Sequence, residues 1–328
     1  MTKSAAGCKE LCCLKRLRAG ACFLEQPWAK TQHNICKEKT GFRQTEIAMV
    51  KFKRTVLVCV LLIASSLAQG PTTFHPGFNF FSRQQDVQLG QESAAQVRRQ
   101  MQIVKDPFLN DYVNRVGRKL ANTPEARASG FPFTFEVVAD PSINAFALPG
   151  GPMFINTGLL KAVDNEAELA GVMGHEMSHV ILRHGTNQAS KAQAIQLPLM
   201  LGSRVAGGSM LGRLGQLGIG LGANSVLLKF SRTAESQADL TGSHLMAESG
   251  YNPMAMARFF EKLSSQGGSR GLQFFSDHPN PRNRERAIEE EADKLPRRNY
   301  GYETGEFGRM KQVVSGVHEP PPRRQVGR

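Results

Sequence analysis

The feature that most restricts the fold of this chain is a pair of histidines, His175 and His179, in one predicted helix. The helix is expected over about residues 166–184, because Asn165 is a typical helix start and a glycine follows the segment. Residues four apart lie on one face of an α-helix, so both imidazoles can reach a single metal ion. Glu176 lies beside that face, where its carboxylate can take a proton from a water molecule. The motif therefore predicts a hydrolytic metal site on this helix.

The positive charge of the chain is concentrated near its start. The 328 residues contain 41 Lys and Arg against 28 Asp and Glu, a formal net charge of +13. Residues 1–68 hold 12 of the basic and 4 of the acidic residues, a surplus of +8, which leaves 29 against 24, or +5, for the rest. A strongly basic balance would favour nucleic acid or a membrane surface as a partner. Because the body is only mildly basic, we expect no nucleic-acid partner.

Cysteines are equally uneven along the chain. All six precede residue 60 (Cys8, Cys12, Cys13, Cys22, Cys36 and Cys59). A body without thiols has no disulfide scaffold, no zinc–thiolate site and no cysteine nucleophile. These classes of site are excluded for residues after 60.

Residues 49–68, which begin at Met49, have the layout of a secretory signal peptide. A basic start is followed by an apolar stretch from Val56 to Ala64, and small residues occupy the positions that signal peptidases recognise. The apolar stretch is shorter than the about 20 residues that span a bilayer. The expected location is therefore the periplasm, and a short uncleaved anchor is the alternative. Residues 1–48 are an unassigned extension, which we interpret as lying before the true translation start.

A catalytic zinc site needs a third protein ligand besides the two histidines. One known pattern places a third histidine six residues after the second, but Gly185 stands there. His184 points away from the ligand face, and we interpret it as structural. Farther along, Glu235 and Asp239 lie one turn apart on a helix expected over about 231–249. One of these carboxylates can ligate the metal while the other accepts a hydrogen bond from a ligating imidazole.

The remaining pattern predicts an α+β domain over residues 83–300, preceded by a linker at 69–82 and followed by a disordered basic tail at 301–328. Its expected elements are helices over 84–104, after Asp106-Pro107 and after Asn252-Pro253, a strand over 131–138, and a hairpin of Ile143–Leu148 with Met153–Asn156. Together the strands should form a small antiparallel sheet between helices.

Four stretches of the sequence resemble a known family of zinc peptidases. They are Asn144–Gly151, His175–His184, Ser231–Asp239 with Ser249–Pro253, and Ser276–Pro279 with Arg284. On these residues, the chain from about 84 to 290 is similar to metallopeptidase family forty-eight, the gluzincins that include the BepA-like, HtpX-like and Oma-type zinc metalloendopeptidases. The resemblance implies a mostly helical zincin-type domain, with the HExxH motif on its active-site helix and one zinc ion per chain.

The resemblance also implies a role for each matching residue. The implied metal ligands are His175, His179 and Glu235, with Glu176 as general base and Asp239 as the partner of a ligating imidazole. A transient fourth ligand that keeps the site latent, or a donor to the tetrahedral intermediate, is implied at His278.

Substrate contacts are implied at two further places. Arg284 would frame the site or bind substrate. The segment with Asn144, Ala145 and Phe146 looks like the family's edge strand, against which an extended substrate pairs by backbone hydrogen bonds.

Three hypotheses about function follow. The first is an endopeptidase that cleaves misfolded or partly assembled cell-envelope proteins, a substrate class implied by the resemblance alone. The second is a largely latent, chaperone-like assembly factor, and the third is an organellar inner-membrane protease. The Gly/Leu-rich segment 198–228 is expected to be a lid over the cleft, a patch that contacts the outer or inner membrane, or a buried helix. Because the chain ends soon after residue 300, we expect no helical-repeat domain of the BepA type.

Overall fold

The structure is a computed structural model that describes residues 70–200, 230–265, 274, 278–279, 283–296 and 298–320, without the side chains of 195–200. The predicted extension and signal peptide, and nearly all of segment 198–228, lie outside these residues. The described helices are α2 (Arg83–Gln100), α3 (Pro107–Ala121), α4 (Pro124–Ser129), α5 (Thr157–Ala162), α6 (Glu166–Ile181), α7 (His184–Met200), α9 (Arg232–Glu248), α10 (Met254–Ser265), α12 (Arg284–Ala292) and α13 (Phe307–Ser315).

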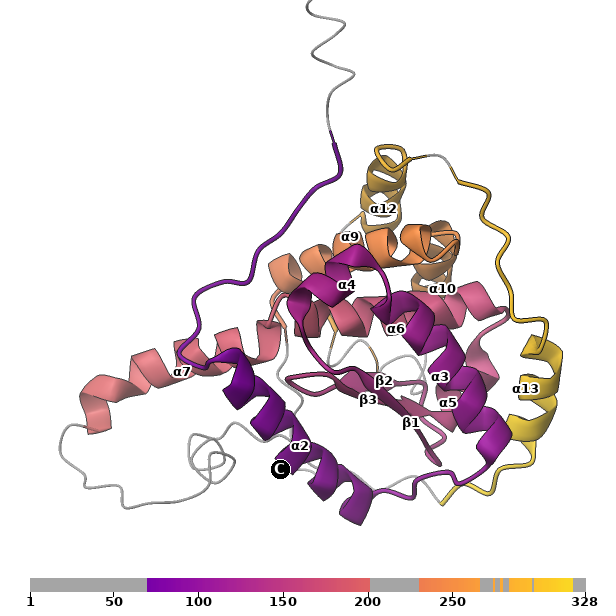
Figure 1. Cartoon of the computed structure of the whole chain (residues 1–328), viewed down its shortest axis with the longest axis horizontal. Helices are drawn as coiled ribbons and strands as arrows, with labels where there is room; N and C mark the ends of the chain where they lie inside the picture. Colours follow the sequence, from indigo (N-terminus) through magenta and orange to yellow (C-terminus); the bar gives the residue numbers. More distant parts are fainter. Residues whose placement is uncertain are drawn as a thin grey trace, which may run out of the picture. The chain divides into compact units, whose positions relative to one another are not determined.

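Three short strands form one sheet among these helices, as the α+β prediction requires (Figure 1). They are β1 (Thr134–Val138), β2 (Ala145–Ala147) and β3 (Pro152–Asn156), in the order β1-β3-β2. The predicted hairpin is confirmed, since β2 and β3 pair antiparallel. The expectation of an antiparallel sheet is wrong for the other pair, because β1 and β3 run parallel. The chain reverses once before β2 and again in the hairpin, so β3 runs in the direction of β1 and takes the central place.

Both faces of the sheet are covered. On one face, Met153 and Ile155 of β3 join the main apolar core, which includes residues of α3 and α6. On the other face, Phe154 packs with Phe146 of β2 and Val97 of α2 in a second cluster. Each large apolar side chain that becomes fully buried stabilises the fold by roughly 1.5–3 kcal/mol. The alternation along β3 thus holds the sheet between α6 and α2, as Figure 1 shows.

The helix starts predicted from local sequence are confirmed. The side chains of Asp106, Asn165 and Ser231 each accept a hydrogen bond from the backbone amide three residues on, at 2.9, 2.9 and 3.2 Å. These caps satisfy amides that have no partner inside the helix. The end of α6 differs from the prediction, because Arg183 adopts a left-handed backbone (φ 56°) and the chain turns into α7 there.

Helices α6 and α9 lie side by side because glycines face each other where they meet (Figure 1). A Cβ placed on Gly242 of α9 would lie 3.1 Å from the backbone nitrogen of His175 and 3.2 Å from the carbonyl carbon of Gly174. Any larger side chain at this position would push the two backbones apart. The glycines therefore bring the histidine helix and the carboxylate helix into direct contact.

The predicted linker at 69–82 packs on the domain over its described residues. Its Thr72 donates its backbone N–H and its hydroxyl to the Glu291 carboxylate of α12, at 2.5 and 2.7 Å. Asn79 donates to the Thr186 hydroxyl of α7 at 2.7 Å. The polar groups of this segment thus find partners on two helices, α12 and α7.

The prediction of a disordered tail at 301–328 is wrong for residues up to 320. Met310 and Val314 of α13 are buried in the main core, and the backbone amide of Thr304 donates to the buried carboxylate of Glu166 at 3.2 Å. Basic and proline residues near the end of the chain masked the helical spacing of apolar residues before them. Residues 321–328 lie outside the described part of the chain.

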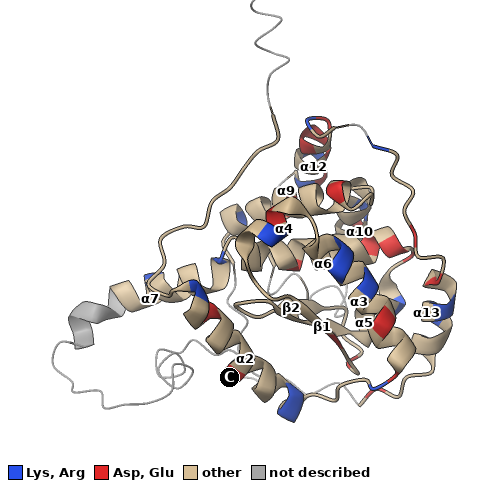
Figure 2. Cartoon of the chain, in the orientation of Figure 1, with Lys and Arg blue, Asp and Glu red and all other residues tan. Residues whose placement is uncertain are grey.

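Figure 2 shows basic and acidic residues spread over the helices of the described domain. Within the described residues, none of the helices has the length and apolar character needed to cross a bilayer.

A buried ion pair between α9 and α12 predicts a pH-dependent contribution to stability. The Nε2 atom of His244 lies 2.8 Å from an oxygen of Glu291. Burial lowers the pKa of His244, but hydrogen bonds with Glu125 and Glu291 outweigh it and raise that pKa above its ordinary 6.5. Burial raises the pKa of Glu291, but hydrogen bonds from Thr72 and other donors outweigh it and lower that pKa from 4.5 to about 2.

The two pKa shifts define the window in which this pair stabilises the protein. A raised histidine pKa contributes stability that is complete below pH 6.5 and is lost as the pH rises through the folded value. A lowered carboxyl pKa contributes stability that is complete above pH 4.5 and is lost as the pH falls toward 2. Urea unfolding should therefore show the largest difference between wild type and Glu291→Gln between pH 4.5 and 6.5. Glu290→Gln, at a side chain that is 66% exposed, is the matched control; a difference that grows toward alkaline pH would contradict this assignment.

Candidate metal centre and active site

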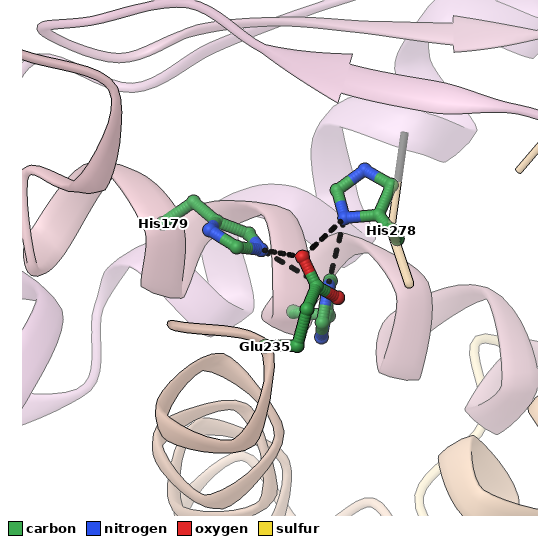
Figure 3. Close-up of side chains that lie close together, drawn as sticks. His179, Glu235 and His278 are labelled. Atoms are coloured by element: carbon green, nitrogen blue, oxygen red, sulfur yellow. Dashed lines mark hydrogen bonds and ion pairs between the residues drawn. The ribbon is translucent and has the colours of Figure 1, made fainter. Parts of the chain in front are cut away.

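Four side chains from three parts of the chain converge at the contact between α6 and α9. One ligand atom from each of His175, His179, Glu235 and His278 lies within 4.8 Å of all the others, and all four residues are buried. Figure 3 shows His179 and His278 on either side of the Glu235 carboxylate, with a ring nitrogen of each directed toward it. The three predicted metal ligands are thus brought together by the fold.

The spacing of these atoms fits a zinc ion. The Nε2 atoms of His175 and His179 lie 3.1 Å apart, and carboxylate oxygens of Glu235 lie 3.3 and 3.5 Å from them. Zinc–nitrogen bonds of about 2.0–2.1 Å in a tetrahedral site would place ligand atoms about 3.3 Å from each other. The donors are two imidazoles and one carboxylate, which is the ligand set of a gluzincin-type zinc site.

Asp239 orients the first histidine, as the sequence suggested. Its Oδ1 atom lies 3.0 Å from Nδ1 of His175. Because a carboxylate can only accept, Nδ1 carries a proton and Nε2 faces the other ligands. Burial lowers the pKa of His175, but hydrogen bonds with Asp239 and Glu235 outweigh it and raise that pKa to about 9. A bound cation would take the place of the proton that these carboxylates attract.

Arg284 of α12 lies behind the ligands rather than at the surface. It donates from Nε to Oδ2 of Asp239 at 2.6 Å and from Nη2 to Glu235 at 3.4 Å. Its guanidinium also lies over the Phe260 ring, 4.2 Å from the centroid. Of the two predicted roles, this buried position favours framing the site over binding substrate.

His184 orients the second histidine, a contact that the sequence analysis missed. It is not among the ligands, in agreement with its predicted direction, but its Nδ1 lies 2.9 Å from Nδ1 of His179. Its Nε2 lies 3.1 Å from the side-chain oxygen of Gln237, so Nε2 carries the proton and Nδ1 accepts. His179 must then donate from Nδ1, and its Nε2 lone pair faces Nε2 of His175.

The Nε2 lone pair of His179 supports the fit of a cation. Burial lowers the pKa of His184 to about 4, and burial followed by the nearby His175 lowers the pKa of His179 well below its ordinary value. The rings of His179 and His184 are therefore neutral at pH 7. The Nε2 lone pair of His179 therefore meets the protonated Nε2 of His175, 3.1 Å away, and a metal cation can take the place of that proton. The spacing of His179 and His184, together with Gln237 two residues after Glu235, was the available sequence clue.

The predicted general base lies next to the ligands and next to the edge strand. Glu176 is 2% exposed, and its Oε1 atom lies 3.3 Å from Nε2 of His278. Burial raises the pKa of Glu176, while the positive charge of His278 and a backbone hydrogen bond from Ala147 of β2 act against it. A carboxyl group with a raised pKa, beside a metal site, is suited to accept and return a proton near neutral pH.

His278 completes the cluster from a third part of the chain. Its Nδ1 atom lies 3.2 Å from Glu235 and 3.3 Å from Nε2 of His175. Its ring stacks on Phe274, with centroids 4.8 Å apart. Burial lowers the pKa of His278, but Glu176 and Glu235 outweigh it and raise that pKa. The imidazole of His278 thus contacts the carboxyl groups of both Glu235 and Glu176.

Strand β2 is an edge strand of the described sheet, as predicted. Asn144 and Leu148 use their inward backbone groups for β3, with hydrogen bonds of 3.1 and 2.7 Å. Since backbone direction alternates along a strand, the N–H and C=O groups of Ala145 and Ala147 point away from β3, and the N–H of Ala147 faces the carboxyl group of Glu176. The side chains of Asn144, Ala145 and Phe146 are buried, so contact with a substrate at these residues would be through the backbone.

Comparisons with known proteins agree with this geometry. A family model described as Peptidase family M48 matches residues 107–292, more than half of the 328-residue chain. The beta-barrel assembly-enhancing protease of Yersinia pestis is 33% identical over 210 residues, which cover 61% of this chain and 42% of that protein. The mitochondrial metalloendopeptidase OMA1 of Schizosaccharomyces pombe is 33% identical over 181 residues, 55% of this chain and 52% of that protein. The metalloprotease LoiP of Escherichia coli is 32% identical over 178 residues, 53% and 68%. The chain thus spans less than half the length of the first of these relatives.

Proposed function

The chain belongs to peptidase family M48, and on this premise we propose that it is a zinc-dependent endopeptidase whose metal is held by His175, His179 and Glu235. The observation that carries the proposal is the convergence of these side chains, from α6 and α9, with a buried glutamate beside them. A zinc ion bound there would acidify a water molecule to a pKa of about 7 and polarise a scissile carbonyl.

The protein's own residues supply the remaining parts of the mechanism. Glu176 takes the proton from the attacking water and later gives it to the leaving amine. Asp239 and His184 hold the two histidine rings in the orientation found above, so no rearrangement of the ligands is needed. The outer edge of β2 binds an extended peptide through the backbone groups of Ala145 and the C=O of Ala147, since Glu176 accepts from the N–H of Ala147.

The proposed substrates are misfolded or partly assembled proteins of the cell envelope, and the proposed location is the periplasm. The name of one relative, the beta-barrel assembly-enhancing protease, supports an envelope role. Backbone pairing along an edge strand supports unfolded substrates, because only extended segments can add a strand. The signal peptide predicted from Met49 supports export.

A largely latent, chaperone-like factor is the second candidate, and His278 is the observation that favours it. Its imidazole lies among the ligand atoms and beside Glu176. We expect the wild type to cleave an unfolded casein-type protein, and His278→Ala to cleave it several-fold faster, because removal of the imidazole opens the place of the attacking water.

This prediction is checked with the full chain produced in cells and recovered from the periplasmic fraction. His318→Ala, at an exposed histidine outside the site, is the control and should leave the rate unchanged. If neither the wild type nor His278→Ala cleaved the substrate, the latent factor would be favoured. A slower rate for His278→Ala would instead assign His278 to the donor role, and absence of the protein from the periplasmic fraction would contradict the proposed location.

A further inference from the structure

A single residue with an unusual backbone, Arg183, lies where the active-site helix turns into the next helix. Helix α6 ends at Ile181, and α7 begins at His184. Between them, Arg183 adopts a left-handed backbone with φ 56°. This conformation is uncommon for a residue other than glycine and is unfavourable by itself. It persists only where the surrounding structure holds it, so its contacts indicate what it is for.

The left-handed turn decides where the ring of His184 lies. In a continuous helix, His184 would project about 140° around the axis from His179, because successive residues are about 100° apart. Its ring would then point away from the metal centre. In the structure its Nδ1 atom lies 2.9 Å from Nδ1 of His179, and the two ring centroids are 5.0 Å apart. The contact between the rings therefore depends on the change of chain direction at Arg183.

The side chain of Arg183 ties this turn to the start of α2. Its Nε donates to Oδ2 of Asp86 at 2.6 Å, and its Nη2 donates to the backbone oxygen of Phe81 at 2.5 Å. The side chains of Arg183 and Asp86 are only 12% and 1% exposed, and hydrogen bonds between charged groups are stronger than neutral ones. Glycine, the usual residue at a left-handed helix end, could adopt this backbone but could not make the connection to α2.

We propose that Arg183 is a positioning residue of the metal centre: tied to α2, its left-handed backbone places His184 where that ring orients the ligand His179. Arg183 is not among the candidate ligands and acts through His184. The inference rests on the proposed function, because the ring of His179 needs a fixed orientation as a metal ligand.

The test is the zinc affinity of the full-chain protein, measured by competition with a chelator. Arg183→Ala and Arg183→Gly are each combined with Asp86→Asn, so that no buried charge is left without its partner. Both variants lose the connection to α2, but only glycine adopts the left-handed backbone without steric cost. We expect the alanine variant to bind zinc about tenfold more weakly than the wild type, as for the loss of a contact behind a ligand, and the glycine variant to recover most of this loss.

A second set of measurements separates positioning from a general loss of stability. In a His184→Ala background, the same change of Arg183 to alanine should weaken zinc binding no further, because its effect passes through His184. The effects of independent sites would instead add. Arg98→Ala is the control, since it removes another arginine–carboxylate pair of α2, with Glu136 at 2.6 Å, and it should keep the wild-type affinity.

A further variant keeps the proposal testable if the alanine variant does not fold. Asp86→Leu with Arg183→Met replaces the ion pair by apolar side chains of similar volume, which proteins often tolerate. It should weaken zinc binding when His184 is present and not in the His184→Ala background. Equal affinities of the variants with and without glycine at 183, or losses that add to that of His184→Ala, would overturn the proposal. If the wild type bound no zinc, the proposed metal site itself would be contradicted.

Discussion

Replacement of Glu176 by glutamine should reduce peptide-bond cleavage by about 10²- to 10⁴-fold, the usual contribution of a general base. The amide has the shape of the carboxyl group but cannot take a proton from the attacking water. The three metal ligands are untouched, so the zinc content should remain that of the wild type. Cleavage of an unfolded protein and metal content, measured on the same preparations, check both parts of this prediction.

The unfolding temperature of the Glu176→Gln protein shows whether any loss of activity comes from loss of the fold. Burial raises the pKa of Glu176, so a neutral side chain at this position fits the surroundings, and the unfolding temperature should be no lower than that of the wild type. Activity near the wild-type level would remove Glu176 from the mechanism. Loss of both zinc and activity would instead mean that the variant disturbed the ligands and not the proton transfer.

The second large effect is expected for Arg284→Met. The side chain of Arg284 is 5% exposed and lies between the carboxylates of Asp239 and Glu235. Removal of one partner from a buried ion pair leaves an uncompensated charge and costs about 3–5 kcal/mol in the free energy of unfolding. Asp239 would also be held less firmly behind His175, and the loss of such a supporting contact weakens metal binding by about 10- to 100-fold.

Urea unfolding and competition with a zinc chelator measure these two effects. Arg286→Met is a matched control, because Arg286 lies on the same helix, α12, with a side chain that is 68% exposed and paired only with Glu290 at 3.5 Å among the described ion pairs. Its effect should stay within about 1 kcal/mol, as for surface ion pairs in general. Equal effects of the two substitutions would show that Arg284 has no special place behind the metal site.

The ligand histidines are each supported by a separate polar contact. Asp239, on α9, fixes the ring of His175, while His184 and Gln237 fix the ring of His179. Such contacts set the tautomer of each ring before any ligand binds. The site is therefore organised by α9 and by the turn after α6, and not by the histidine helix alone.

Local sequence patterns predicted the parts of the fold that depend on a few neighbouring residues. The caps at Asp106, Asn165 and Ser231 start their helices where expected, and the hairpin forms around its Pro-Gly-Gly-Pro turn. The four-residue spacing of His175 and His179 likewise places both rings on one face of α6. These features follow from backbone hydrogen bonds and side-chain spacing within a few residues.

Contacts between distant segments were harder to predict. The parallel pairing of β1 with β3, the packing of Thr72 on Glu291 and the helix at 307–315 each depend on a partner far along the chain. His184 was interpreted as structural because its direction excluded it as a ligand, and its contact with His179 became visible only when Gln237 of α9 was placed beside it. Each of these outcomes follows from burial of apolar surface and polar partners that are adjacent only in three dimensions.

The sequence by itself determined the family and predicted the helix and the residue types of the proposed metal site, because these are encoded in short motifs. Only the tertiary structure decided how the site is closed and supported. Asp239 meets His175 across 64 residues and His278 meets it across 103, while Arg284 reaches Asp239 across 45. These meetings require α6 and α9 to touch at Gly174 and Gly242, and that close approach is a property of packed helices, which local spacing along one segment does not specify.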